Sequence, residues 1–349
     1  MINLHVLSLD ELKQWLVTNG EKPFRAKQIF QWIYEKKETD WEKMTDLNVS
    51  LRNLLKTHFS LSPLKLVKMQ HSTDSETIKF LWELSDGNLV ESVLIGSDER
   101  RTVCVSSQVG CPARCSFCAS GKEGLLRNLN TAEIFAQVYE IDRILHQKQE
   151  RVSHVVFMGM GEPFENYENV LKSIHLLISV DRLNISQRRI TVSTVGVVEG
   201  IRRFMEEGLK VNLVLSLHAP NQHIRKKIIP YARRYPLEEI IEAMVDYFKV
   251  TNRDVTYEYT LIKDINDKQE HAEELAELLK GQQCTVNLIP YNPVPGLSLS
   301  RPEKEDIELF REILVERGIN TTWRYTKGKD IAAACGQLAM QNKLQLMTS

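Results

Sequence analysis

Apolar and polar positions alternate at helical intervals through the first part of the chain. Leu12, Trp15 and Leu16 recur at the spacing of one helix face, and residues 25–36 carry a second apolar stripe. Such short amphipathic stretches pack against one another when no strand lies between them. We therefore expect a small helical accessory domain over residues 1–70.

A β-rich stretch follows the helical part. Two runs of strand type, 77–84 and 89–95, flank a polar tetrapeptide that contains Asp86 and Gly87. The Asp-Gly pair is typical of a tight hairpin turn. This pattern predicts a β-hairpin linker over residues 71–96.

From about residue 100 onwards, strand-type runs alternate with helix-type runs. The expected strands are 102–106, 152–158, 189–194, 211–216, 256–260, 284–289 and 321–324, and the expected helices are 131–147, 166–179, 198–207, 237–249, 268–280 and 303–317. Strands that alternate with helices form parallel sheets with right-handed crossovers. Six or seven such units are fewer than the eight that close a full barrel. We predict an α/β fold, a partial (β/α)6 barrel over residues 97–330 with a tail at 331–349.

Two of the expected helices carry sequence signals for their first turns. Asn130 precedes one of them, with Glu133 three residues later. Ser300 and Glu303 have the same spacing before another. Both pairs are typical of capping boxes, in which each side chain bonds the backbone amide of the other residue.

The charge balance limits the kinds of partner that the chain can have. The formal net charge is −1, which argues against a protein that coats nucleic acid without specificity. A local basic run without acidic residues is nevertheless present: Arg225, Lys226, Lys227, Arg233 and Arg234. It is a candidate for a contact with RNA, and the alternative is an ordinary solvated surface.

Hydropathy and the termini bear on location. No run of 18 apolar residues occurs, so we expect no transmembrane helix and no membrane partner. The N-terminus lacks a basic region followed by an apolar stretch, so we expect no secretory signal and a cytoplasmic location. In a reducing compartment, clustered cysteines bind metal or do chemistry more often than they form disulfides.

Three of the six cysteines are clustered. Cys111, Cys115 and Cys118 have three and then two residues between them. Thiolates favour iron–sulfur clusters or zinc, and a cubane held by three residues leaves one iron open for a substrate or cofactor. A zinc site would need a distant fourth ligand and more often uses a two-residue spacing twice. The spacing favours the cluster over zinc, and over three buried free thiols.

Four polar loops follow different expected strands, and such loops meet at one end of a parallel barrel. They are 159–162, 193–194, 216–218 and 291–293. Glycines in the first loop let the backbone approach a ligand, and its glutamate suits an ammonium group. Each loop alone is equally consistent with a strand-ending turn, and His218 with a structural histidine.

The cysteine spacing, with an aromatic residue before the third cysteine, resembles the radical S-adenosylmethionine (SAM) superfamily. Longer ordered motifs resemble one branch of it, the RlmN/Cfr family of ribosomal RNA adenine methyltransferases. They are 24–29, 90–93, 104–111, 127–129, 157–163, 216–220, 287–293 and 333–338.

The resemblance implies two cofactors and the residues that bind them. Cys111, Cys115 and Cys118 would hold a [4Fe–4S] cluster whose open iron chelates SAM. Contacts to SAM are implied for Gly161, Glu162, Ser193, Ser216, Leu217, His218 and Asn292. An electron from the cluster would then cleave the sulfonium to methionine and a 5′-deoxyadenosyl radical.

The family's target is carbon 2 of an adenine, or carbon 8 in the Cfr branch. That carbon is electron-poor, as is the methyl group of SAM, so the methyl must first rest on a nucleophile; a thiolate suits this role. By resemblance, Cys335 carries the methyl group, Cys104 resolves the adduct through a transient disulfide, and Glu91 is the proton acceptor. Whether Glu91 or Cys104 takes the ring proton stays open. The plain alternatives are buried free cysteines and an exposed glutamate at a strand edge; Cys284 is expected to be core.

The expected activity is methylation of an adenine carbon, C2 in preference to C8, in 23S ribosomal RNA, with transfer RNA as a second candidate. We also expect a flavodoxin-like electron donor and a monomer. The sequence departs from the family pattern at 231–232, at 322–325 and after Pro163, near the expected substrate entrance. The rival hypotheses are a radical enzyme with another substrate and an RNA-binding protein with structural zinc.

Overall fold

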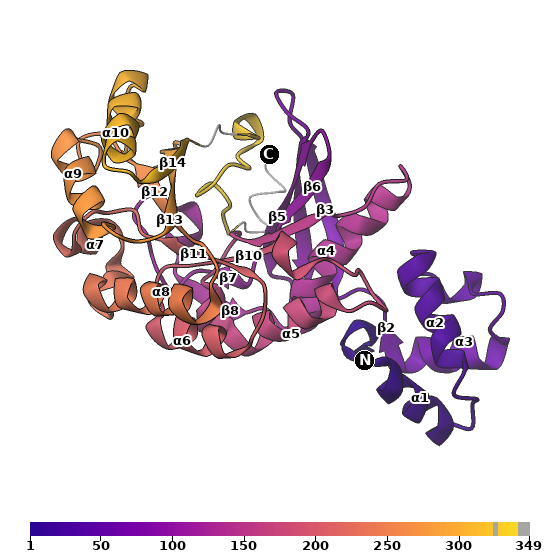
Figure 1. The fold of residues 1–349 in the computed structure, drawn as a ribbon. Helices are drawn as coiled ribbons and strands as arrows, with labels where there is room; N and C mark the ends of the chain where they lie inside the picture. The colour runs from indigo at the N-terminus through magenta and orange to yellow at the C-terminus, as the bar shows by residue number, and fades with distance from the viewer. Residues whose placement is uncertain (324–326, 341–349) are drawn as a thin grey trace.

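A computed structural model describes residues 1–323 and 327–340 of the chain. Within them the main sheet has ten strands in the order β14-β13-β12-β11-β10-β9-β6-β5-β4-β3, and two small sheets pair β1 with β2 and β7 with β8. Figure 1 shows the N-terminal helices at one end of the molecule and the sheet with its covering helices beyond them.

The N-terminal helices are α1 (Leu9–Thr18), α2 (Arg25–Phe30) and α3 (Val49–His58), and α2 continues through a π-helical turn at Gln31–Glu35. The short strands β1 (Ile2–Asn3) and β2 (Phe59–Ser60) pair in parallel and bring the two ends of this region together. Leu12, Ile29 and Leu51, one from each helix, are fully buried. The apolar stripes in the sequence therefore form the core that was expected of them.

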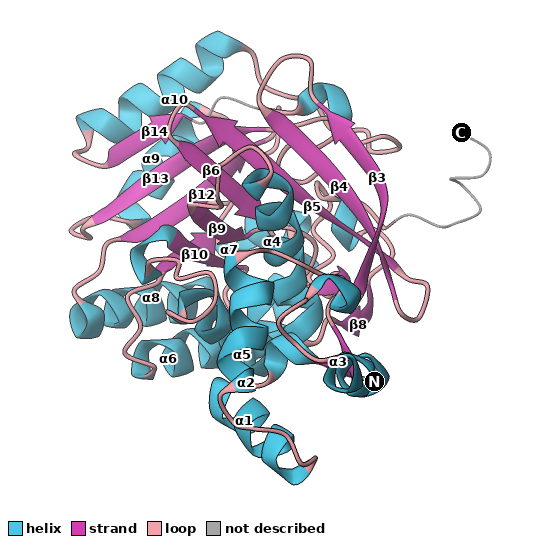
Figure 2. Cartoon of the chain, turned by 90° about the vertical axis from the view of Figure 1, so that its right-hand side faces the viewer, coloured by secondary structure: helices cyan, strands magenta, loops and turns pink. Residues whose placement is uncertain are grey.

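Strands β3 (Leu64–His71), β4 (Thr77–Leu84) and β5 (Leu89–Ser97) are antiparallel neighbours. The turn between β4 and β5 contains Gly87 at φ 84°, a conformation that glycine adopts without strain. The expected hairpin is present, and it extends the main sheet beside β6, as Figure 2 shows. The division of the chain into domains remains a prediction.

The other seven strands of the main sheet are parallel neighbours: β6 (Arg100–Cys104), β9 (His154–Phe157), β10 (Ile190–Thr194), β11 (Asn212–Ser216), β12 (Val255–Leu261), β13 (Cys284–Pro290) and β14 (Asn320–Trp323). The helices between them are α4 (Thr131–His146), α5 (Tyr167–Ile178), α6 (Val198–Glu206), α7 (Gln222–Ile228), α8 (Leu237–Thr251), α9 (Gln269–Leu278) and α10 (Lys304–Glu316). Each crossover leads to the next strand of the sheet in the same direction, which gives an open barrel of six strand–helix units. The predicted α/β partial barrel is confirmed.

Of the two predicted helix capping boxes, one is present in the structure and one is not. Asn130 accepts a hydrogen bond from the Glu133 amide at 3.0 Å and Glu133 accepts from the Asn130 amide at 2.9 Å, so the predicted capping box of α4 is confirmed. The predicted box at Ser300 is wrong, because α10 begins only at Lys304 and Glu303 is the residue before it. The Glu303 carboxylate instead pairs with Lys263 at 3.0 Å.

Several elements were not predicted, among them β3, most of which lies in the stretch 1–70 that was expected to be helical. The hairpin of β7 (Gln108–Gly110) and β8 (Leu125–Asn128) encloses the cysteine loop, and α7 is a short helix after β11. The strands of this hairpin are too short to leave a periodic pattern. Among the described helices, none is both long and apolar enough to cross a bilayer.

Candidate active site

The cysteine loop is fixed at its base by the β7–β8 hairpin. The Cys111 amide donates to the Gly124 carbonyl at 3.0 Å, which closes the loop across the hairpin. Gly110 has φ 77°, and a Cβ at this position would lie 2.0 Å from the Gly124 carbonyl oxygen. The close approach of the two strands therefore requires glycine here.

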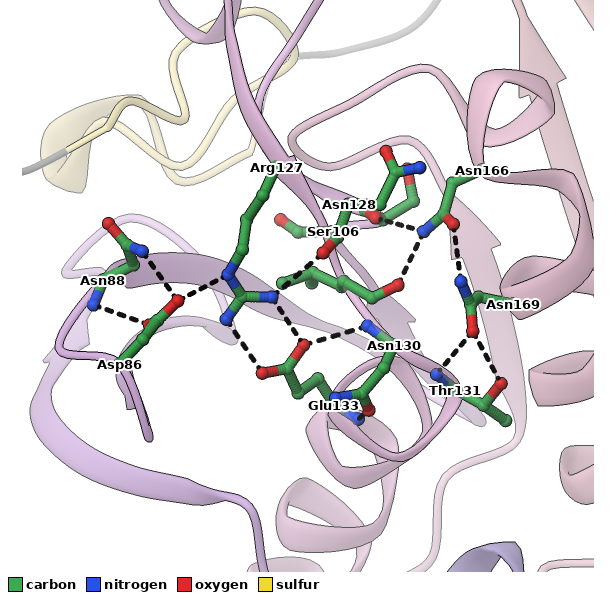
Figure 3. A network of polar contacts seen from close by, with 12 residues as sticks. Asp86, Asn88, Ser106, Arg127, Asn128, Asn130, Thr131, Glu133, Asn166 and Asn169 are labelled. Carbon is green, nitrogen blue, oxygen red and sulfur yellow. Dashed lines mark hydrogen bonds and ion pairs between the residues drawn. The ribbon is translucent and has the colours of Figure 1, made fainter.

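A polar network anchors the same hairpin to the rest of the protein (Figure 3). Arg127 on β8 donates to both carboxylate oxygens of Glu133 at 2.9 Å, and its Nε contacts Asp86 in the β4–β5 turn. The Arg127 guanidinium lowers the pKa of Asp86 to about 2. Asn166 extends the network, because its amide donates to the carbonyl of Leu129 at 2.7 Å.

The three clustered cysteines, Cys111, Cys115 and Cys118, line one cavity of about 140 Å³. Burial raises the pKa of the Cys111 thiol to about 12 and that of Cys115 well above its usual value. Within the described residues no three Cys, His, Asp or Glu side chains meet at a position for a single metal ion. In a cubane each thiolate binds a different iron, so the three sulfurs need not meet at one point. Metal coordination would also deprotonate these thiols, so the donor set fits an iron–sulfur cluster.

The expected SAM residues come from several strand ends of the same cavity. Its lining includes Gly161, Glu162, Ser193, Ser216, His218 and Asn292, so one cavity combines these six with the cysteines. Beside Gly161, the buried Ser107 hydroxyl has no hydrogen-bond partner within the described part of the chain, and a Cβ on Gly161 would lie 2.6 Å from it. Ser107 does not line the cavity, and its close approach explains why position 161 requires glycine. Ser107 was not predicted.

Glu162 is buried and held by the end of β10. Its carboxylate accepts from the Val195 amide at 2.7 Å, the Thr194 hydroxyl at 2.8 Å and the Phe164 amide at 3.0 Å. Burial nevertheless raises its pKa to about 7. A positively charged group bound nearby would favour the ionised form.

His218 lines the cavity and also forms a structural hydrogen bond with β12. Its Nδ1 accepts from the Thr260 amide at 3.0 Å, and burial lowers its pKa to about 3, so the ring is neutral with its proton on Nε2. The ring lies edge-on to Phe117 at 5.0 Å between centroids. The preceding residue, Leu217, is fully buried and its side chain packs in the main hydrophobic core.

Cys335 joins this cavity to a second one. The second cavity has a volume of about 300 Å³, and its lining includes Cys104, Cys118, Asn292 and Cys335. Cys335 also lines the first cavity, and its carbonyl accepts from the Asn292 amide at 3.1 Å. Cys104 is buried at the end of β6. The structure thus brings two cysteines that are far apart in sequence to one space beside the cysteine loop.

Glu91 lies on β5 with 1% of its side chain exposed, so the alternative of an exposed edge glutamate is wrong. Its carboxylate pairs with Lys79 at 3.2 Å and accepts from the Ala339 amide at 3.0 Å. Lys79 was not predicted. Cys284, on β13, is only partly buried, at the edge of the main core.

Arg225 does not belong to a basic surface. It is fully buried, and its guanidinium donates to the carbonyls of Leu217 at 3.2 Å and Val195 at 2.5 Å. Burial lowers its pKa to about 10, opposed by the nearby Cys115 and Glu162. The prediction of Arg225 as an RNA contact is therefore wrong. Its spacing of three residues from the buried Ile228 is the signal that places it on the inner face of α7.

Family models match both parts of the chain. Residues 2–61 match the model described as "Ribosomal RNA large subunit methyltransferase N-terminal domain", and residues 105–279 match the "Radical SAM superfamily".

Similar proteins cover nearly the whole chain. A protein of Protochlamydia amoebophila named "Probable dual-specificity RNA methyltransferase RlmN 2" is 64% identical over 95% of this chain and 93% of its own length. One of Bacillus licheniformis, named "Probable dual-specificity RNA methyltransferase RlmN", is 48% identical over 98% of this chain and 94% of its own. The crystal structure of a radical SAM methyltransferase from Sphaerobacter thermophilus superposes with a TM-score of 0.94 at 46% identity, over 97% of this chain and 99% of that one.

Membership of the superfamily brings with it a [4Fe–4S] cluster and SAM as cofactors, for which the cysteine loop and the strand-end cavity provide fitting donors. Relatives that are 48–64% identical over nearly the whole chain, together with the two family models, identify the family. The chain belongs to the RlmN family of radical SAM RNA methyltransferases.

Proposed function

We propose that this enzyme methylates carbon 2 of an adenine in large-subunit ribosomal RNA and that Cys335 carries the methyl group. The observation that supports this best is that Cys335 lines both the cavity of the cysteine loop and the cavity of Cys104. From that position one thiol has access to a methyl donor on one side and to a second thiol on the other. A thiolate is a strong nucleophile towards a sulfonium methyl group.

When bound, the cluster and SAM supply the methyl group and a radical that activates it. Cys111, Cys115 and Cys118 would hold the cluster. The residues that would bind and orient SAM are Gly161, Glu162, Ser193, Ser216, Leu217, His218 and Asn292. Glu162 is the residue suited to an ammonium group, because three donors already fix its carboxylate in place. The neutral His218 presents a donor at Nε2.

Release of the product requires a proton acceptor and a way to break the bond to sulfur. We assign the first role to Glu91 and the second to Cys104, which would form a transient disulfide with Cys335. Forming that S–S bond as the carbon–sulfur bond breaks requires both sulfur atoms in one space, and the two cysteines line the second cavity together. Burial of Cys104 limits side reactions of this thiol with other oxidants.

The RNA substrate and the other partners belong to the same proposal. Relatives are named dual-specificity RNA methyltransferases, which supports a second kind of RNA substrate, and we propose transfer RNA for it. We expect a flavodoxin-like protein as the electron donor, a monomeric enzyme and a cytoplasmic location, where ribosomal RNA is found.

Two measurements test the proposal. Mass spectrometry of the purified protein should find a methyl group on Cys335, and Cys335→Ala should abolish methylation of RNA. Digestion of RNA methylated by the enzyme should yield 2-methyladenosine. Recovery of 8-methyladenosine would replace carbon 2 by carbon 8, and an active Cys335→Ala enzyme would exclude the carrier role.

A further inference from the structure

The segment that carries Cys335 has little regular structure of its own. Residues 327–340 contain one short helical turn, Lys329–Ile331, and three left-handed positions, Gly328, Ala332 and Gly336. Such a segment is held in place by its contacts with the rest of the protein rather than by an internal ladder of hydrogen bonds. In Figure 1 it runs between β14 and the β5–β6 pair.

One set of contacts joins this segment to the cysteine loop. The Ala119 amide donates to the Gly336 carbonyl at 2.8 Å, and the Ser120 hydroxyl donates to the Leu338 carbonyl at 2.6 Å. The two donors, Ala119 and Ser120, come directly after Cys118 in the sequence. These hydrogen bonds therefore fix the position of the segment relative to the predicted cluster.

A second set comes from a buried ion pair on the antiparallel part of the sheet. Lys79 on β4 and Glu91 on β5 lie diagonally across the two strands, since Lys79 is opposite Val93 and Glu91 is opposite Leu81. Their charged atoms are 3.2 Å apart, and the side chains are 6% and 1% exposed.

Both members of this pair reach the Cys335 segment, on opposite sides of the cysteine. The Lys79 ammonium donates to the Ala332 carbonyl at 3.3 Å, three residues before Cys335. The Glu91 carboxylate accepts from the Ala339 amide at 3.0 Å, four residues after it. One ion pair therefore holds both ends of the segment 332–339.

A buried ion pair is weak evidence for a stabilising role, because removing two charges from water costs about as much as their attraction returns. Apolar residues would serve the sheet as well as Lys79 does. Its distinguishing feature is its geometry: a long side chain with several donors bridges Glu91 and a backbone carbonyl of an otherwise loosely structured segment.

We propose that Lys79 is a positioning residue, which with Glu91 fixes residues 332–339 so that Cys335 stays between the two cavities. The inference rests on the proposed function for its consequence, methyl transfer through Cys335, but the contact itself can be tested separately. Lys79 acts through the segment and through Glu91, not on the adenine.

The first test measures the segment in the full-length, cluster-loaded enzyme without RNA. Hydrogen exchange followed by mass spectrometry should show the Ala339 and Ala119 amides exchanging about tenfold faster in Lys79→Met than in the wild type. Lys79→Arg keeps the charge and the donors, so it should restore most of the protection. Lys65→Met is the matched control, because Lys65 is an exposed lysine that also pairs with a glutamate across two strands, Glu83 at 3.7 Å between β3 and β4.

The second test measures the reaction. In Lys79→Met the kcat for RNA methylation should fall about tenfold or more while KM for RNA stays unchanged, because a displaced thiol slows the reaction without altering the RNA contacts. Lys79→Gln is the second variant should the Met variant fold poorly, since it keeps a donor beside Glu91 but is too short to reach Ala332. The same direction of change is expected for it.

Exchange and kcat equal to those of Lys65→Met would overturn the inference, as would faster exchange with an unchanged kcat. The exchange experiment does not depend on what Cys335 does. An unmethylated Cys335 in the active wild-type enzyme would refute the proposed function alone, whereas an unchanged segment in Lys79→Met would refute the inference alone.

Discussion

The roles of the buried charged residues could not be read from the sequence motifs in which they stand. Arg225 stands first in a run of basic residues, yet its guanidinium bonds backbone carbonyls at the ends of β10 and β11. Glu91 was expected from resemblance alone, and the structure adds the buried Lys79 beside it. Side-chain type was readable from the sequence, but burial depends on which strands become neighbours, and a single sequence does not specify that.

Replacing Arg225 by Met tests its role inside the barrel. The change leaves the carbonyls of Val195 and Leu217 without their donor in a buried place, so the free energy of unfolding should fall by about 1–3 kcal/mol. Urea unfolding of the cluster-free protein measures it. Lys226→Met changes an exposed neighbour on the same helix and should stay within about 0.5 kcal/mol of the wild type. Equal stabilities of the two variants would contradict a structural role for Arg225.

Elements with a long periodic pattern were predictable, and short ones were not. The seven parallel strands and six of the helices lie within a few residues of their expected bounds, because each has an apolar face of the right period. The β7–β8 hairpin and α7 were missed, since three to seven residues leave too little pattern to recognise. The eight-residue β3 was missed as well, because it is exposed along most of its length and has no continuous apolar face. Yet the β7–β8 hairpin determines where the cysteines lie, and the six strand-end residues meet them in the cavity only because the sheet curves into a barrel.

The hairpin can be tested at Gly110. Gly110→Ala places a Cβ against the Gly124 carbonyl, so the strands must separate, and iron bound per protein after reconstitution should fall by half or more. Gly208→Ala is the control, because Gly208 has φ 64° with open space around it and incurs only the left-handed strain of about 1–2 kcal/mol. Iron content and the cluster absorption measure the outcome. Equal loading of both variants would show that the hairpin can open without disturbing the cysteine loop.

At the scale of the whole molecule, both the antiparallel strands and the barrel contact the segment 332–339 and the residues just before it. Asp330 accepts from the Ser72 hydroxyl and the Thr73 amide, each at 2.8 Å, so the turn after β3 also holds the chain just before this segment. The cysteine loop holds the segment from the barrel side through Ala119 and Ser120. The sheet extension that sequence patterns indicated only as a linker is thus part of the support for Cys335.

The charge distribution of the whole molecule leads to a prediction about RNA. Because the net charge is −1, binding of RNA phosphates depends on local clusters of cations. In the basic run 225–234, Arg225 is buried, but Lys226, Lys227 and Arg233 are exposed. This run lies beside the cysteine loop, because the Ser116 amide donates to the Ile228 carbonyl at 2.8 Å. If each cation neutralises one phosphate, reversing all three charges should reduce the slope of log K against log salt by about 2 to 3 and weaken RNA binding at low salt.

Filter binding of a ribosomal RNA fragment over a series of salt concentrations measures both quantities. The matched control reverses Lys249, Lys280 and Arg317, three exposed cations at or just after the C-terminal ends of α8, α9 and α10, which lie at the opposite end of the barrel from the strand ends that line the cavity. The control should lower overall affinity slightly through net charge and leave the slope within about 0.5 of the wild type, because screening weakens charges that lie far from the RNA. Equal slopes for the two triple variants would mean that RNA does not contact this run, and the basic residues would then be an ordinary solvated surface.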